Sequence, residues 1–167
     1  MGRSVTACFP LDFPRAPEGL AAGRAPSPGA ELASHVLAYD PRADGALITS
    51  AYDMAAEAHA PQKRDDGQPY IVHPLAVAEI LAGYRLDTGS IITALLHDTV
   101  EDTSLKLGDI ESRFGKEVAR LVDGVTKLTR LELQSERTKQ AENFRKLVLA
   151  MSEDIRVLVI IVGYRVV

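Results

Sequence analysis

From position 47 onward, apolar side chains recur at steps of three and four residues, the spacing of an amphipathic α-helix. In the first stretch Ile48, Ala51, Tyr52 and Ala55 share one face, and Pro61 ends the pattern. Further stretches carry the same spacing over 74–84, 88–102, 107–114, 116–128 and 140–155. Pro74 suits a first helical position, and Thr88 or Ser90 is expected to cap the next helix. The pattern predicts an all-α domain of about six helices over 47–167.

The segment before this domain differs in composition. Residues 1–46 are rich in proline, glycine and alanine, and the prolines between positions 10 and 28 exclude a continuous helix there. Only 31–39 has the composition of a short helix. Because the segment carries little patterned apolar surface, we expect a mostly disordered N-terminal leader.

The last twelve residues, RVLVIIVGYRVV, lack the polar face of a surface helix. Seven of them are β-branched, and such side chains favour extended backbone. Gly163 would also weaken a helix. Local propensity therefore predicts a β-strand at this end of the domain.

Charge and composition exclude several classes of protein. The net charge of −4 is unlike that of a nucleic-acid binder, which normally carries a basic face. The single cysteine, Cys8, excludes an internal disulfide framework and suits a reducing cytoplasm. No run reaches the ~18 apolar residues of a membrane span. We expect a cytoplasmic protein that binds neither nucleic acid nor membranes.

The stretch LLHDTVEDT, from Leu95 to Thr103, carries the chemistry. Four ionisable groups follow an apolar run there: His97, Asp98, Glu101 and Asp102. On a helix they would project within an arc of roughly 140°, since each residue turns by about 100°. Imidazole and carboxylate together are ligands for manganese, iron or zinc, and a second carboxylate pair one turn later suits proton transfer at a water. The alternative is an acidic, solvated helix end.

Two other histidines are candidates for this site. His73 precedes Pro74 at a predicted helix start, and a lone histidine there is more often part of a core. Together with His97, which follows 24 residues later across one helix and a turn, it becomes a second imidazole ligand. His59 lies on the apolar stripe of its own helix, and we interpret it as structural.

Four segments together resemble the N-terminal HD-type hydrolase domain of the RelA/SpoT family: AHAPQKRDDGQPYIVHPLAVAEILA, TALLHDTVEDT, RFGKEVARLVDGVTKLT and QAENFRKLVLAM. The resemblance covers about residues 47–160. It implies an all-helical HD fold and a Mn²⁺-dependent removal of the 3′-pyrophosphate of (p)ppGpp, which yields GDP and pyrophosphate.

Matched residue by residue, the resemblance implies a role for each part of the site. His73, His97 and Asp98 match metal ligands, and Glu101 and Asp102 match the pair assigned to the attacking water. The expected substrate-binding residues are Arg64, which matches an arginine that stacks on guanine, with Lys63 and Tyr70. Asp65 and Asp66 depart from the family's pattern and would repel a polyphosphate.

One metal ligand of the family has no counterpart. The family carries an aspartate on a late helix, and Tyr164 stands at that position here, three residues before the last residue. The phenol of a tyrosine, with an ordinary pKa of about 10, is a poor ligand near neutral pH. The domain therefore resembles a C-terminally truncated one.

Three functions follow as alternatives. The first is a (p)ppGpp 3′-pyrophosphohydrolase that uses Mn²⁺. The second is a catalytically weak or inactive fragment that keeps the helical bundle but lacks the fourth ligand. The third is an HD phosphohydrolase that acts on another nucleotide.

Overall fold

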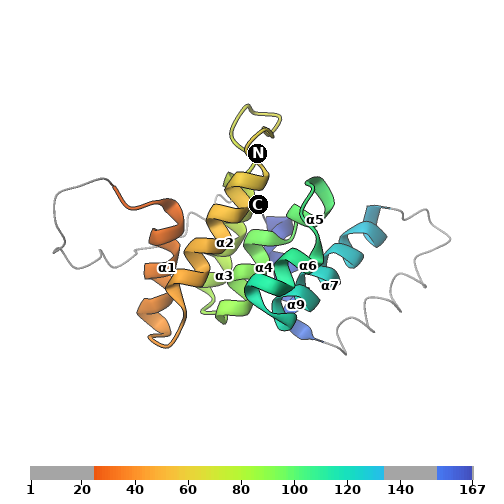
Figure 1. Cartoon of the computed structure of the whole chain (residues 1–167). Coiled ribbons are helices and arrows are strands. Elements are labelled where there is room, and N and C mark those ends of the chain that lie inside the picture. The colour runs from red at the N-terminus through yellow and green to blue at the C-terminus, as the bar shows by residue number, and fades with distance from the viewer. Residues whose placement is uncertain (1–24, 134–153, 167) are drawn as a thin grey trace, which may run out of the picture.

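The computed structural model describes residues 25–133 and 154–166, and these form an all-α fold without a β-strand (Figure 1). The helices in chain order are α1 (Pro28–Tyr39), α2 (Gly45–Ala58), α3 (Val72–Gly83), α4 (Thr88–Leu96), α5 (Thr99–Asp102), α6 (Leu107–Phe114), α7 (Lys116–Leu133) and α9 (Ile155–Val166). The predicted all-α class is confirmed. The expected helix over 140–155 falls almost wholly outside the described residues.

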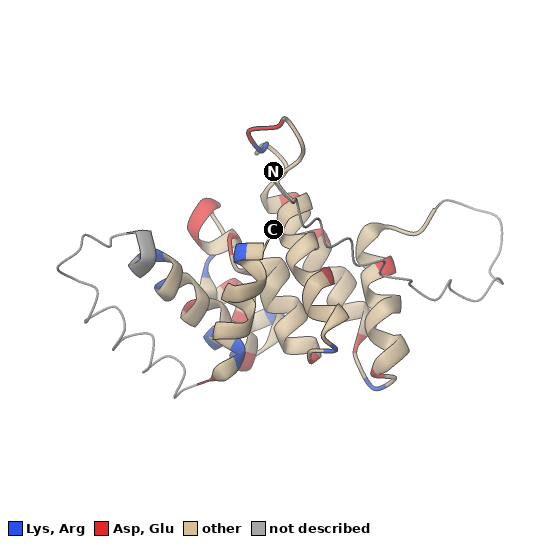
Figure 2. Ribbon diagram, turned by 180° about the vertical axis from the view of Figure 1, so that it is seen from behind, with Lys and Arg blue, Asp and Glu red and all other residues tan. Residues whose placement is uncertain are grey.

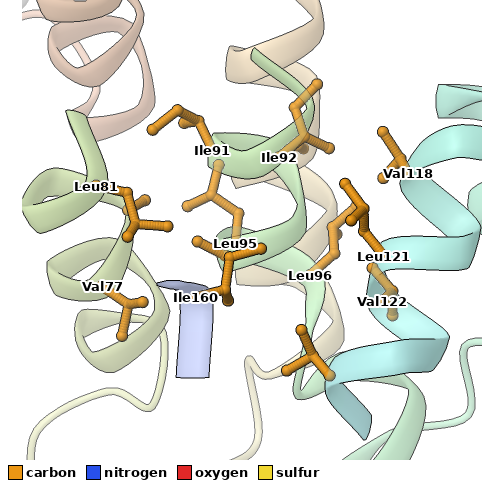
Figure 3. Close-up of a cluster of buried hydrophobic side chains, with 14 of the residues drawn as sticks. Val77, Leu81, Ile91, Ile92, Leu95, Leu96, Val118, Leu121, Val122 and Ile160 are labelled. Carbon is orange, nitrogen blue, oxygen red and sulfur yellow. The ribbon is translucent and has the colours of Figure 1, made fainter. Parts of the chain in front are cut away.

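Helix α4 lies at the centre of the bundle. It packs against α2, α3, α7 and α9, and every residue from Ser90 to Leu96 is buried. The sequence explains this position, because TGSIITALL has no charged residue and no polar face to turn toward water. The core around α4 is drawn in Figure 3, with side chains from four helices: Val77, Leu81, Ile91, Ile92, Leu95, Leu96, Val118, Leu121, Val122 and Ile160.

Helix α1 lies within the expected leader and packs on the domain. The short helix expected over 31–39 is present and begins earlier, at Pro28. Leu32, Ala33 and Val36 are buried, and α1 lies along α2 (Figure 1). Ser27 caps the helix by accepting a hydrogen bond from Ala30 N at 3.2 Å. Gly29 permits the close approach, since a Cβ there would lie 2.7 Å from Tyr52 Cβ. The part of the leader over 1–24 lies outside the described residues.

The predicted strand at the C-terminal end is also wrong, because this segment forms helix α9. Val157, Ile160, Ile161 and Gly163 are buried in it, and α9 packs on α3, α4 and α7. At Gly163 an added Cβ would lie 3.2 Å from Leu81 Cδ2, so the missing side chain lets α9 approach α3 closely. Burial of this face overrides the β-propensity of its residues, which is worth well under ~1 kcal/mol each.

Several helix boundaries differ from the expected ones. Helix α3 begins at Val72, so Pro74 is its third residue. Asp87, rather than Thr88 or Ser90, occupies the N-cap position of α4, and its side chain accepts a hydrogen bond from Ser90 Oγ at 2.7 Å. The predicted helix over 88–102 is divided into α4 and α5.

Charged residues of both signs are interspersed over the visible face, as Figure 2 shows, and the loop between α2 and α3 carries both. In the described part of the chain, no helix is both long and apolar enough to cross a membrane.

Candidate metal centre

Three metal-ligating side chains meet where α3 begins and α4 ends. His73 lies in the first turn of α3, and His97 and Asp98 follow the last residue of α4. All three are buried, and one ligand atom from each lies within 4.8 Å of the others. The structure thus brings together the three residues that the sequence predicted as ligands.

The tautomer of His97 is fixed by its own helix. Its Nδ1 lies 2.7 Å from the carbonyl oxygen of Ala94, and a carbonyl can only accept, so Nδ1 carries the proton. In a neutral ring the lone pair is then on Nε2, which is buried and has no hydrogen-bond partner among the described residues. Nε2 lies 3.1 Å from Asp98 Oδ1. A ring nitrogen held in this way by a backbone carbonyl is the usual arrangement of a metal-ligating histidine.

His73 presents an imidazole in the form that a metal requires. Burial lowers its pKa from the ordinary value, and the nearby charge of Asp98 only partly opposes that effect. Neither ring nitrogen has a hydrogen-bond partner within the described ranges, although both are buried. Unpartnered buried polar atoms cost free energy unless something satisfies them. A divalent cation between these imidazoles and Asp98 fits this donor set.

The helix is interrupted between α4 and α5, where threonine hydroxyls donate hydrogen bonds to the backbone carbonyls of Leu96 and His97. Thr99 Oγ1 donates to Leu96 O at 2.6 Å, and Thr126 Oγ1 of α7 lies 3.5 Å from His97 O. His97 and Asp98 keep near-helical backbone angles through the break. The two ligands therefore stay close to the directions that a continuous helix would give them.

Glu101 and Asp102, the carboxylate pair that follows His97 and Asp98 by one helical turn, differ in burial. Glu101 Oε1 accepts a hydrogen bond from Arg130 Nε of α7 at 2.7 Å, and its side chain is largely buried. Asp102 is exposed, at the rim of the same region. Arg130 was not among the predicted site residues. It lies 29 positions from Glu101 and only the tertiary fold brings them together.

The loop between α2 and α3 carries the predicted substrate-binding residues. Lys63 pairs with Pro69 in an isolated antiparallel bridge, and Gly67 takes the positive φ of 84° that the tight turn requires. Lys63 is exposed and Arg64 is partly buried. Arg64 opens the turn at the outer end of this loop, where its N–H donates to Gln68 O at 2.8 Å and its carbonyl oxygen accepts from Gly67 N at 2.9 Å. The loop stands out from the helices (Figure 1).

Tyr70, at the end of this loop, faces the metal ligands. Its hydroxyl donates to Asp98 Oδ2 at 2.9 Å and lies 3.4 Å from Asp102 Oδ2. Burial, followed by the charge of Asp98, raises the pKa of Tyr70 above its ordinary value, so the phenol remains a hydrogen-bond donor. His59, predicted to be structural, is buried and stacks on Tyr70 with a centroid distance of 4.5 Å.

Tyr164 in the last turn of α9 covers the two imidazoles. Its ring centroid lies 5.0 Å from that of His73 and 5.4 Å from that of His97. Both ring pairs are edge-to-face, with interplanar angles of 82°. The residue at position 164 therefore stands beside the ligands, where the resemblance expects a fourth ligand.

Comparison with known proteins gives consistent matches. The HD domain family matches residues 51–167. The chain is 49% identical over 130 residues to the GTP pyrophosphokinase rsh of Brucella ovis, a match that covers 78% of this chain and 17% of that protein. It is 50% identical over 113 residues to the guanosine-3′,5′-bis(diphosphate) 3′-pyrophosphohydrolase of Vibrio cholerae and to the bifunctional (p)ppGpp synthase/hydrolase SpoT of Escherichia coli. These two matches each cover 68% of this chain and 16% of the relative.

The chain therefore spans about a sixth of the length of the curated relatives that it matches. A solved structure described as a metazoan ortholog of SpoT that hydrolyzes ppGpp aligns with a TM-score of 0.43 and 21% identity, covering 72% of this chain and 86% of that one. That likeness is too remote to bear on the site. The family match and the half-identical segments together establish that the chain belongs to the HD domain family, close in sequence to RelA/SpoT-type proteins.

Proposed function

We propose that this domain is a Mn²⁺-dependent (p)ppGpp 3′-pyrophosphohydrolase, which splits ppGpp with water into GDP and pyrophosphate. The observation that carries the proposal is the buried set of His73, His97 and Asp98, with the Nε2 atoms of both imidazoles left without hydrogen bonds by the described residues. The 50% sequence identity over 113 residues to a protein named as a guanosine-3′,5′-bis(diphosphate) 3′-pyrophosphohydrolase supports the choice of substrate.

The residues of the site would have separate roles in hydrolysis, namely metal binding and proton transfer. His73, His97 and Asp98 would hold a divalent ion, which would supply Lewis acidity and favour ionisation of a water. Glu101 and Asp102 provide carboxylates to accept and return protons, and Arg130 holds Glu101 in place through its hydrogen bond. The proton removed from the attacking water passes to a carboxylate and then to the 3′ oxygen of the leaving GDP.

Basic residues of the loop between α2 and α3 would hold the nucleotide. The planar guanidinium of Arg64 suits stacking on guanine, and the exposed Lys63 suits contact with phosphate oxygens. Asp65 and Asp66 at the tip of the same loop are exposed carboxylates and would repel the phosphates.

Position 164 favours a second candidate, a domain with the same site but little turnover. The Tyr164 ring packs against both imidazoles and offers no carboxylate to a metal. Loss of groups that merely orient a ligand already costs ~10–100-fold in metal affinity or activity, so the loss of a ligand costs at least as much.

Release of pyrophosphate from ppGpp, measured with and without Mn²⁺, tests the proposal. The native chain is compared with Tyr164→Asp and with His97→Gln. Mn²⁺-dependent release by the native chain, abolished in His97→Gln, supports the hydrolase. Turnover that appears only in Tyr164→Asp supports the second candidate. Faster cleavage of GTP, NADPH or a deoxynucleotide than of ppGpp contradicts the substrate, and Mn²⁺-independent release contradicts the mechanism.

A further inference from the structure

The hydroxyl of Tyr70 connects the loop between α2 and α3 to two carboxylates of the metal centre. Its single proton is donated to Asp98 Oδ2 at 2.9 Å, and Asp102 Oδ2 lies farther away at 3.4 Å. Tyr70 lies 28 residues before Asp98 in the chain, so this contact depends on the tertiary fold. The phenol oxygen thus points toward a metal ligand.

The two oxygens of Asp98 are assigned to different neighbours. Oδ2 accepts the hydrogen bond from Tyr70 and lies 3.9 Å from His73 Nε2, whereas Oδ1 lies closer to an unpartnered imidazole nitrogen, at 3.1 Å from His97 Nε2. A carboxylate without such a bond can rotate and present either oxygen. Holding one oxygen leaves the other directed at the position between the ligands, and such orientation strengthens metal binding.

The Tyr70 ring packs on His59, which belongs to a hydrogen-bond network whose donors and acceptors can be assigned. Gln62 Nε2 donates to the backbone oxygen of Asp102 at 2.6 Å, and Gln62 Oε1 lies 2.8 Å from His59 Nδ1. Because the Asp102 carbonyl can only accept, the amide orientation is determined, and His59 donates from Nδ1. The His59 ring then packs on Tyr70, at 4.5 Å between centroids.

We propose that Tyr70 is a positioning residue of the metal centre rather than a contact for the nucleotide. It orients Asp98 as a ligand, while Gln62, which donates to the backbone oxygen of Asp102, keeps Asp102 beside it. This inference rests on the metal site of the proposed function and is independent of the substrate. Substrate binding, the role that sequence resemblance suggested for Tyr70, would need the hydroxyl that Asp98 already uses.

Mn²⁺ affinity of Tyr70→Phe, measured by electron paramagnetic resonance of the free ion without nucleotide, tests this role. The substitution removes one oxygen and keeps the ring on His59. We expect Mn²⁺ to bind ~10–100-fold more weakly. Tyr84→Phe is the matched control, because Tyr84 is 76% exposed and lies away from the ligands, and its Mn²⁺ affinity is expected to equal that of the native chain.

The outcomes separate this inference from the proposed function. Equal Mn²⁺ affinity of the native chain and Tyr70→Phe, with only the KM for ppGpp raised, overturns the positioning role and restores substrate contact. Weaker Mn²⁺ binding in a chain that hydrolyses no ppGpp supports the role of Tyr70 and contradicts the substrate. A native chain that binds no divalent ion overturns both.

A second variant covers the case in which Tyr70→Phe does not fold, as judged by its unfolding transition in the presence of a chelator. Gln62→Leu keeps the Tyr70 hydroxyl but releases the Asp102 carbonyl and His59. We expect a several-fold loss of Mn²⁺ affinity and an altered absorption spectrum of the Co²⁺-substituted protein. Native affinity together with a native Co²⁺ spectrum in that variant contradicts the positioning network.

Discussion

Arg156 Nη1 in the first turn of α9 lies 3.0 Å from Asp87 Oδ2, at the residue that precedes α4. At the other end of the same two helices, Tyr164 packs against His97. Helices α4 and α9 therefore run parallel and are joined at both ends. The guanidinium also lies 2.7 Å from Glu117 of α7 and 2.6 Å from Asp154, so three carboxylates meet one cation.

Replacing Arg156 by methionine is expected to lower the free energy of unfolding by about 1–2 kcal/mol. An isolated exposed ion pair contributes only ~0.2–1 kcal/mol, but here the Arg156 side chain is 26% exposed and pairs with three carboxylates. Chemical denaturation at moderate salt measures the change. Arg156→Lys keeps the positive charge but lacks the planar guanidinium that can bind carboxylates through paired hydrogen bonds. An intermediate loss of unfolding free energy is expected. A methionine variant as stable as the native chain would show that apolar packing alone holds α9.

Gly29→Ala is expected to destabilise the domain by about 1–3 kcal/mol, as overpacking does. The new Cβ would meet Tyr52 Cβ at 2.7 Å, and that atom is fixed to the backbone of α2, so α1 must move away. Gly83→Ala is the control, because nothing lies within 4 Å of a Cβ there. Thermal unfolding compares the two. Equal effects would mean that α1 does not pack on α2 in solution.

Alkaline pH is expected to destabilise the native fold through Tyr39. Its hydroxyl donates to Leu86 O at 2.7 Å, and burial, followed by the charges of Asp40 and Asp87, raises its pKa from 10.0 to about 12. The folded state holds the phenol proton more tightly than the unfolded state, so this contribution is complete below pH 10 and is lost as the pH rises to about 12.

The comparison with Tyr39→Phe isolates this effect. The variant lacks the hydroxyl, so its unfolding free energy should fall less steeply over the same pH range. When the folded variant is titrated by tyrosinate absorbance, it should show one fewer tyrosine that ionises above the ordinary pKa. Parallel pH profiles of the two proteins would contradict the assignment.

Chelation is expected to lower stability, since an ion that binds only the folded state stabilises it. At a free Mn²⁺ concentration about 100 times the Kd, the gain is about 2.7 kcal/mol. Denaturation midpoints with Mn²⁺ and with EDTA measure it. His73→Ala should abolish the difference, whereas Tyr84→Phe should keep it. A midpoint that does not respond to Mn²⁺ in the native chain would argue against the metal centre.

The helices whose periodicity is clear in the sequence were predicted well, as α2, α3, α6 and α7 show. The ligand cluster also follows from local sequence, because His97 and Asp98 are adjacent and His73 begins the neighbouring helix. The predicted roles of Glu101, Asp102, Lys63 and Arg64 stay predictions. Partners far apart in the chain were not predictable, and Arg130 beside Glu101 is the example.

The sequence by itself determined the all-α class, and it predicted the cluster of His73, His97 and Asp98, since both depend largely on spacings along neighbouring helices. Only the tertiary structure decided that α1 packs in the domain, that the β-branched segment forms α9 and that the Tyr70 hydroxyl bonds Asp98. The reason is that local propensities differ by less than ~1 kcal/mol per residue, whereas burying one large aliphatic side chain contributes ~1.5–3 kcal/mol. Burial depends on neighbours that the chain brings together only when it folds.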